Sequence, residues 1–255
     1  MFIRKPCTYL IVFYLSSVLI ASPITAWAQP ITANVVGAKV GKKNKVGGEY
    51  RNGYELDEAN PEIDGSFTDR LDLFYNVADD IQLRFFFNRL VPPNENWKFT
   101  STFIEPSFQI FHNKKHGFDG AILTGLTLNH AEEGAHQFRT ILSGEVPVKS
   151  FAFRHNSIIA HQLGTYMETG VRYEARWRIT YKVLDGLKLG GEMFNNFMNL
   201  SDSVSFDEGV HRAGLMAEGK LFGNLGFQAG ALRGLSELAP DWAFKFWLNY
   251  SYQNK

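Results

Sequence analysis

The sequence predicts an all-β protein: a closed antiparallel transmembrane β-barrel of about twelve strands, with ten strands as the alternative. Apolar and polar residues alternate with a period of two through most of the chain, as in strands that have one apolar and one polar face. Aromatic residues make up 15% of the chain, yet no stretch after residue 28 reaches the roughly 18 consecutive apolar residues of a membrane helix. Short turns alternate with longer loops, as in outer-membrane barrels with short periplasmic turns.

Residues 1–28 predict a cleaved secretory signal peptide. Arg4 and Lys5 precede an apolar run over residues 9–21, and Ala-Trp-Ala at 26–28 forms a small-x-small cleavage site. The apolar run is too short for a spanning helix, and an uncleaved membrane anchor is the alternative interpretation. We therefore expect export through the inner membrane of a Gram-negative cell and residence in the outer membrane.

Removal of the signal peptide would also remove Cys7, the only cysteine. The exported chain would then have neither a disulfide nor a thiolate nucleophile. Of the 26 Lys and Arg, two lie in the signal peptide, so 24 would remain against 26 Asp and Glu, a net charge of −2. This balance argues against a nucleic acid partner.

The alternation places eleven strands after residue 66 and one before it. The expected strands cover residues 45–56, 67–77, 81–87, 103–111, 117–129, 137–146, 153–162, 167–183, 187–198, 211–222, 224–234 and 241–252. Two apolar residues, Ile141 and Trp247, fall on the polar side of the pattern. We expect residues 45–255 to form the barrel and residues 29–44 to form a flexible lead-in.

The segment 167–183 has the clearest pair of faces. Its apolar face would meet lipid, whereas its charged face cannot, since each Arg or Lys at the middle of the bilayer costs about 2–4 kcal/mol. The charged residues are therefore expected to line the lumen, together with inward-facing residues of other strands. This predicted set consists of Glu168, Arg172, Glu174, Arg176, Arg178, Lys182, Glu192, Glu218 and Lys245. Two interpretations stay open: a charged constriction that selects small polar or anionic solutes, or a lumen of salt bridges that only stabilises the barrel.

A second motif could carry catalysis. His155 and Ser157 form a His-x-Ser pair, and Glu168 follows eleven residues after the serine. The three resemble the dyad and glutamate of outer-membrane lipid A deacylases, which implies acyl transfer by a histidine-activated serine. Ile158 stands where that family has asparagine, and the alternation does not put all three side chains on one face.

The C-terminal stretch GALRGLSELAPDWAFKFWLNYSY, residues 230–252, resembles a group of proteobacterial outer-membrane barrel proteins similar to the phenol-degradation-pathway barrels. The matching positions are Gly234, Leu235, Ser236, Pro240 and Asp241, with Ser236 in place of threonine. The likeness extends loosely back to about residue 65. It implies an outer-membrane barrel described as a transporter, and it says little about activity.

These observations give three functional hypotheses. The first is a narrow channel or transporter for small solutes through a charged lumen, the second a closed structural or surface-interaction barrel, and the third a lipid-modifying hydrolase. We expect outer-membrane lipid and the barrel-assembly machinery as partners. No cofactor or metal is expected, because the acidic loops and scattered histidines have neither EF-hand nor zinc-ligand spacing.

Overall fold

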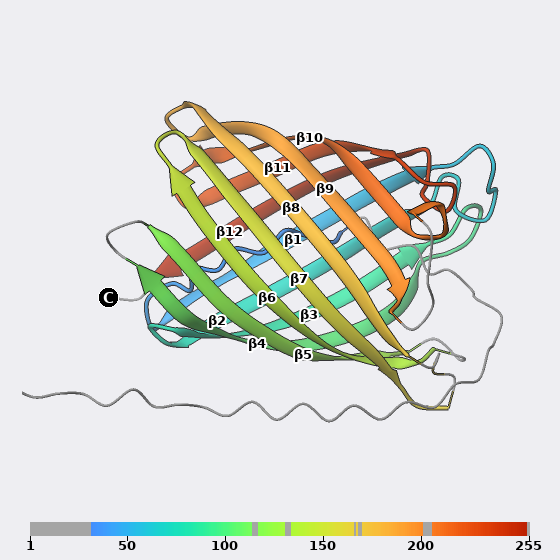
Figure 1. The fold of residues 1–255 in the computed structure, drawn as a ribbon, viewed down its shortest axis with the longest axis horizontal. Helices are drawn as coiled ribbons and strands as arrows, with labels where there is room; N and C mark the ends of the chain where they lie inside the picture. Colours follow the sequence, from blue (N-terminus) through green and yellow to red (C-terminus); the bar gives the residue numbers. More distant parts are fainter. Residues whose placement is uncertain are drawn as a thin grey trace, which may run out of the picture.

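Twelve antiparallel strands close into one barrel in the computed structural model (Figure 1). The structure describes residues 32–113, 117–130, 134–165, 167, 170–200 and 206–253. The predicted signal peptide and Glu168 lie outside these residues. No helix in the described part of the chain is long and apolar enough to cross a membrane.

Each strand pairs with its neighbours in sequence, and β1 pairs with β12 to close the barrel. This confirms twelve strands rather than ten. The strands are β1 (Lys45–Leu56), β2 (Phe67–Ala78), β3 (Ile81–Val91), β4 (Lys98–Asn113), β5 (Phe118–Asn129), β6 (His136–Val148), β7 (Phe151–Leu163), β8 (Val171–Leu184), β9 (Leu187–Asn199), β10 (Val210–Phe222), β11 (Leu225–Gly234) and β12 (Trp242–Gln253), and one 3-10 turn, η1 (Phe206–Glu208), precedes β10.

The two ends of the barrel differ in their connections. At the turn end, β2–β3, β6–β7, β8–β9 and β10–β11 are joined by two residues each. Three of these turns contain a residue in the left-handed region: Lys149, Gly186 and Gly223, with φ of 55°, 86° and 52°. Such positive φ values suit tight hairpin turns. The opposite end, the loop end, has the longer connections, as the sequence predicted.

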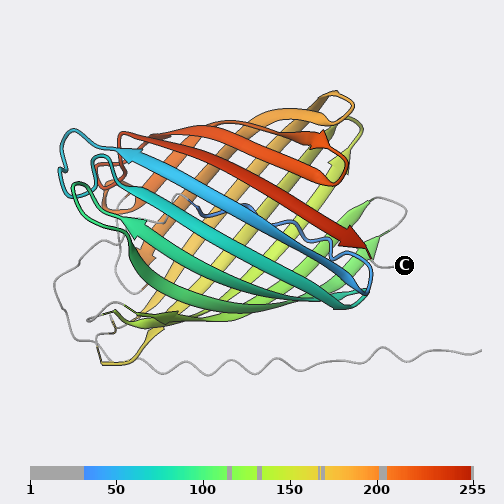
Figure 2. The same ribbon diagram turned by 180° about the vertical axis from the view of Figure 1, so that it is seen from behind.

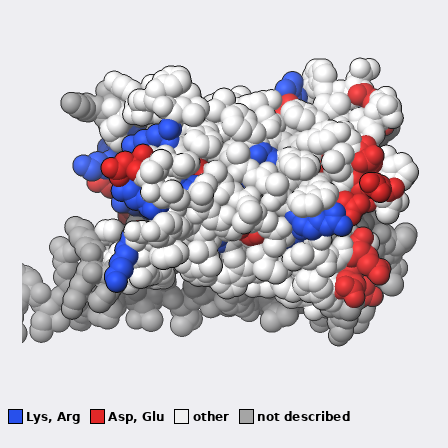
Figure 3. Space-filling model, turned by 90° about the horizontal axis from the view of Figure 1, so that it is seen from above, with Lys and Arg blue, Asp and Glu red and all other residues white. Residues whose placement is uncertain are grey.

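The outer face of the wall is apolar. Leu73, Ile179 and Phe246, from three different strands, are 44%, 52% and 42% exposed. In Figure 3, uncharged side chains cover most of the visible flank, and charged side chains gather toward the two ends, with acidic ones over the loop end. A closed sheet leaves no strand edge unpaired, so such a wall can stand in hydrocarbon. The aromatic face of the last strand, β12, is therefore on the outside of the barrel.

The described residues before β1 lie inside the barrel (Figure 2). Residues 32–44, called the strap below, run along the lumen from the loop half toward the turn end (Figure 2). The sequence pattern predicts a flexible lead-in over residues 29–44 and gives no sign that residues 32–44 lie in the lumen. Within the strap, Val35 and Ala38 are fully buried.

Candidate functional site in the barrel lumen

The charged face of β8 points into the barrel. Arg176 and Arg178 are buried, whereas Trp177 and Ile179 between and after them are exposed on the outer face. Arg172 and Glu174 lie on the same inner face and are half-buried. Lys182 is exposed near the turn end, where its Nζ lies 2.5 Å from Asp185 Oδ1. The face is as predicted, and a role of these residues in selectivity stays a prediction.

Four of the predicted residues meet in one network. Arg178 Nε donates to Glu192 Oε1 at 2.6 Å, and Lys245 Nζ contacts the other oxygen of Glu192. Arg178 Nη1 also lies 3.2 Å from Glu218 Oε2. Lys188 adds a 2.9 Å contact to Glu218. The network therefore connects β8, β9, β10 and β12 across the inner wall. These residues are far apart in sequence, and the pairing register of the strands brings them together.

A second network lies across β1, β2 and β3 and was not predicted. Arg51 Nη2 lies 3.0 Å from Asp72 Oδ2, and Arg84 contacts the same oxygen. The Arg51 guanidinium also stacks 4.8 Å from the ring of Trp247. Trp247, one of the two exceptions to the alternation, is thus an inner-wall residue whose ring forms cation–π contacts with Arg51 and Lys245. That exception was the sequence signal for this network.

A stacked ladder of rings and arginines lines the wall between β2 and β6. The rings of Phe86 and Phe103 are stacked with centroids 5.1 Å apart. Arg70 lies over Phe86 at 3.6 Å, and Arg139 over Phe103 at 4.1 Å. Arg139 Nη2 also donates to Glu105 at 2.9 Å. Cation–π contacts of this kind are strongest where water is excluded.

Polar side chains of the wall bind the strap backbone. Asn156 accepts from the Val36 amide at 2.7 Å and donates to the Val36 carbonyl at 2.9 Å. Ser143 Oγ also donates to this carbonyl at 2.9 Å. Arg176 donates to the Asn34 carbonyl at 3.0 Å. These bonds satisfy strap groups that would otherwise be buried without partners.

Two apolar patches of the inner wall hold the strap side chains. One contacts Val36 and Ala38, and the other contacts Ala33 and Val35 on the opposite side of the strap. The first patch includes Ile141, the other exception to the alternation. Apolar groups on a lumen wall are removed from water only when something covers them, and the strap does so. The patches consist of Ala121, Leu123, Ile141 and Ile158, and of Phe194, Leu232 and Ala243.

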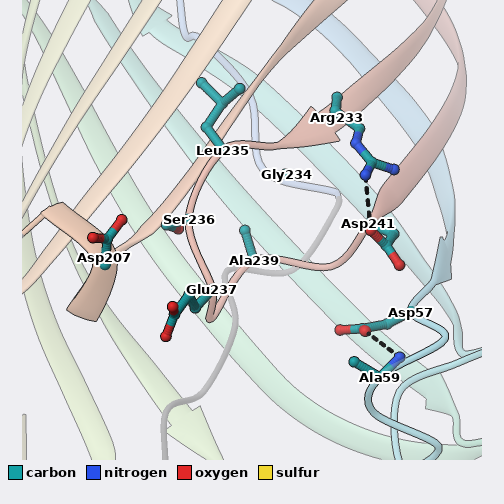
Figure 4. Close-up of a pocket in the computed structure, with 10 residues that line it drawn as sticks. All are labelled: Asp57, Ala59, Asp207, Arg233, Gly234, Leu235, Ser236, Glu237, Ala239 and Asp241. Carbon is teal, nitrogen blue, oxygen red and sulfur yellow. Dashed lines mark hydrogen bonds and ion pairs between the residues drawn. The ribbon is translucent and has the colours of Figure 1, made fainter.

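A cavity of about 380 Å³ opens at the loop end (Figure 4). Acidic residues dominate its charged lining, and Arg233 pairs with Asp241 at 3.0 Å. Ser236, in the resemblance motif, donates to the Gly209 carbonyl at 2.7 Å and accepts from the His211 amide at 3.0 Å. The motif hydroxyl therefore fastens the last loop to β10. The lining residues are Asp57, Ala59, Asp207, Arg233, Gly234, Leu235, Ser236, Glu237, Ala239 and Asp241. No group of three or more His, Cys, Asp or Glu among the described residues is placed to hold a metal.

The His-x-Ser pair lies on the outer face of β7. His155 Nε2 and Ser157 Oγ are 2.8 Å apart, and the His155 ring lies 3.8 Å from the ring of Trp177. The pair sits near the middle of its strand, at the depth of hydrocarbon, where lipids present neither ester carbonyls nor water. Glu168 lies outside the described residues. The hydrogen bond is formed, but its position does not favour a hydrolase.

Neither family models nor curated proteins match the chain. Solved structures do. The COG4313 outer membrane channel from Pseudomonas putida F1 is 14% identical, with a TM-score of 0.62 over 84% of this chain and 97% of that chain. The KdgM porin is 12% identical (TM-score 0.59; 81% and 99% covered), and the NanC porin is 8% identical (TM-score 0.55; 81% and 100% covered). At these identities the likeness concerns the fold, which is that of outer-membrane β-barrels.

Proposed function

We propose that this protein is an outer-membrane channel that passes small solutes through a narrow, charged lumen. The observation that carries the proposal is the strap itself. The bore admits an extended polypeptide, and in the described part residues 33–43 form no strand pairing with the wall. A bore wide enough for an extended chain is also wide enough for a small solute. The names of the similar structures, an outer membrane channel and two porins, support this proposal.

The location belongs to the same proposal. The chain would be exported by its signal peptide and inserted by the barrel-assembly machinery, with the turn end in the periplasm. The apolar outer face supports this placement, since it would be costly in water over so large an area. We also propose kinship with the phenol-degradation-pathway barrel group, on the loop motif that contains Ser236.

A closed structural barrel would serve a different function. Its expected feature is a lumen in which every charge has a partner. Most lumen charges do have partners, but the buried Arg70 forms no ion pair with a described carboxylate. This exception, together with the channel and porin names above, favours the channel.

Single-channel recording in a planar bilayer tests the proposal. The chain from residue 29 onward would be refolded, inserted and recorded, beside a version that lacks residues 32–44. Steady, ion-selective steps that grow several-fold without the strap are expected. A barrel that inserts but stays silent in both forms would rule out a channel and favour a structural role.

A further inference from the structure

Arg70 is a buried lumen arginine that has no ion pair of its own among the described residues. It is 9% exposed, and its Nε has no hydrogen-bond partner. Asp72, two residues along the same face, is already shared by Arg51 and Arg84. A buried cation without an anionic partner is costly. The side chains around Arg70 therefore determine what its guanidinium can bind.

The carboxylates near Arg70, those of Asp72 and Glu49, are already paired with Arg51 and Arg84. Arg51 is its register partner on β1, and like charges directly opposite each other on a sheet repel. The Phe86 ring 3.6 Å below the guanidinium holds its plane in position. A ring face attracts a cation but offers no acceptor to the N–H groups in the guanidinium plane. The Arg70 guanidinium is therefore held in a fixed orientation, with the N–H donors in its plane.

Arg70 lies near the level of Thr32, the first described residue of the strap. It is the fourth residue of β2 from the loop end. The Thr32 carbonyl, the first described acceptor of the strap, receives a hydrogen bond from Arg51 at 3.4 Å. The cavity of Figure 4 opens at this same end of the barrel.

We propose that Arg70 is a binding point for the carboxylate of a small solute in transit, an inference that rests on the channel proposed above. A planar guanidinium with free donors matches a carboxylate by two parallel hydrogen bonds. The charged residues that line the loop-end cavity are acidic except for Arg233, so the whole channel need not prefer anions. The site would instead hold a carboxylate briefly and slow the ions that follow it.

Acetate block of the single-channel current tests the inference. Acetate would replace chloride at constant ionic strength, in wild type, Arg70→Gln and Arg70→Lys. We expect acetate to reduce the wild-type current, and the half-blocking concentration to rise about tenfold or more in Arg70→Gln, because a hydrogen-bonded charge pair is lost. Arg70→Lys keeps the positive charge but loses the planar pair of N–H donors, so its half-blocking concentration of acetate should lie between those of wild type and Arg70→Gln.

Arg89→Gln is the matched control. Arg89 also stacks on a ring, that of Trp97, but it lies on the opposite face of the adjacent strand and pairs with Asp69 at 2.6 Å. It should leave the acetate block unchanged. Equal block in wild type and Arg70→Gln, or no block in either, would overturn the inference while the channel itself still conducts.

A binding measurement separates this inference from the channel. In detergent, acetate should raise the unfolding midpoint of wild type more than that of Arg70→Gln, because a ligand that binds only the folded state stabilises it. A barrel that never conducts would end the channel proposal, and this shift would still support the carboxylate site. The same midpoint shift in both proteins, or none in either, would overturn the site.

Discussion

The outer and inner faces of the wall are made by alternate residues of the same strands, yet they follow different rules. On β8, Ile179 and Tyr181 are about half exposed on the outside, whereas Arg178 and Thr180 are 3% exposed on the inside. An outer residue needs only to be apolar, because its partner is lipid. Most charged inner residues have a particular partner, either an opposite charge on the wall or a group of the strap, and Arg70 is the exception. We therefore expect the outer face to tolerate exchange of one apolar residue for another, and the inner face to lose stability when a partner is removed.

Loss of the Glu192 charge should have the largest effect on stability. The buried Glu192 carboxylate is shared by Arg178 and Lys245. Glu192→Gln replaces this carboxylate with a neutral amide, so both buried cations lose the negative charge that they share. We expect the free energy of unfolding to fall by about 3–5 kcal/mol. Equilibrium urea unfolding in lipid vesicles measures this change.

The ion pair of Glu95 and Lys98 provides the control. Both side chains are more than half exposed, Glu95 in the β3–β4 connection and Lys98 as the first residue of β4. Glu95→Gln should change the free energy of unfolding by no more than about 1 kcal/mol. Equal losses in the two variants would contradict the view that the inner wall depends on specific partners.

A charge on the outer face should cost less than the loss of Glu192. Ile179→Arg places a cation near the middle of the lipid-facing wall and should lower the free energy of unfolding by about 2–4 kcal/mol. The matched variant is Val183→Arg, on the same outer face at the turn end of the strand, where the cost falls to about 0–1 kcal/mol. If both positions tolerate arginine equally in vesicles, the outer face of β8 does not meet lipid.

The smallest effect is expected on selectivity. Replacing both Arg176 and Arg178 with Gln removes two lumen cations, but each is largely neutralised by a carboxylate: Arg176 by Glu174, and Arg178 by Glu192. Reversal potentials under a salt gradient should move toward cation preference by a modest amount. An unchanged reversal potential would show that these arginines act only as structural partners.

The sequence was sufficient for the strands and their faces, because lipid imposes a period of two on every strand. It could not supply the networks around Glu192 and Asp72, since those depend on register between strands distant in the chain. Ile141 and Trp247 were visible as exceptions, and each proved to be an inner-wall residue with a specific partner. The position of the strap was not predicted. Val35 and Val36 contact opposite walls, so the segment has no single apolar face.

A disulfide between the strap and the wall tests most directly whether the strap lies in the lumen. Ser143 Oγ donates to the Val36 backbone carbonyl at 2.9 Å, and the Val36 side chain packs in the same apolar patch as Ile141, two residues before Ser143. A chain that begins at residue 29 has no native cysteine. Oxidation of the folded Val36→Cys, Ser143→Cys protein should close a loop of more than 100 residues and change its mobility on a denaturing gel, while neither single variant should change. Absence of the crosslink in the folded barrel, with the strap cut by an added protease, would contradict a strap held inside the barrel.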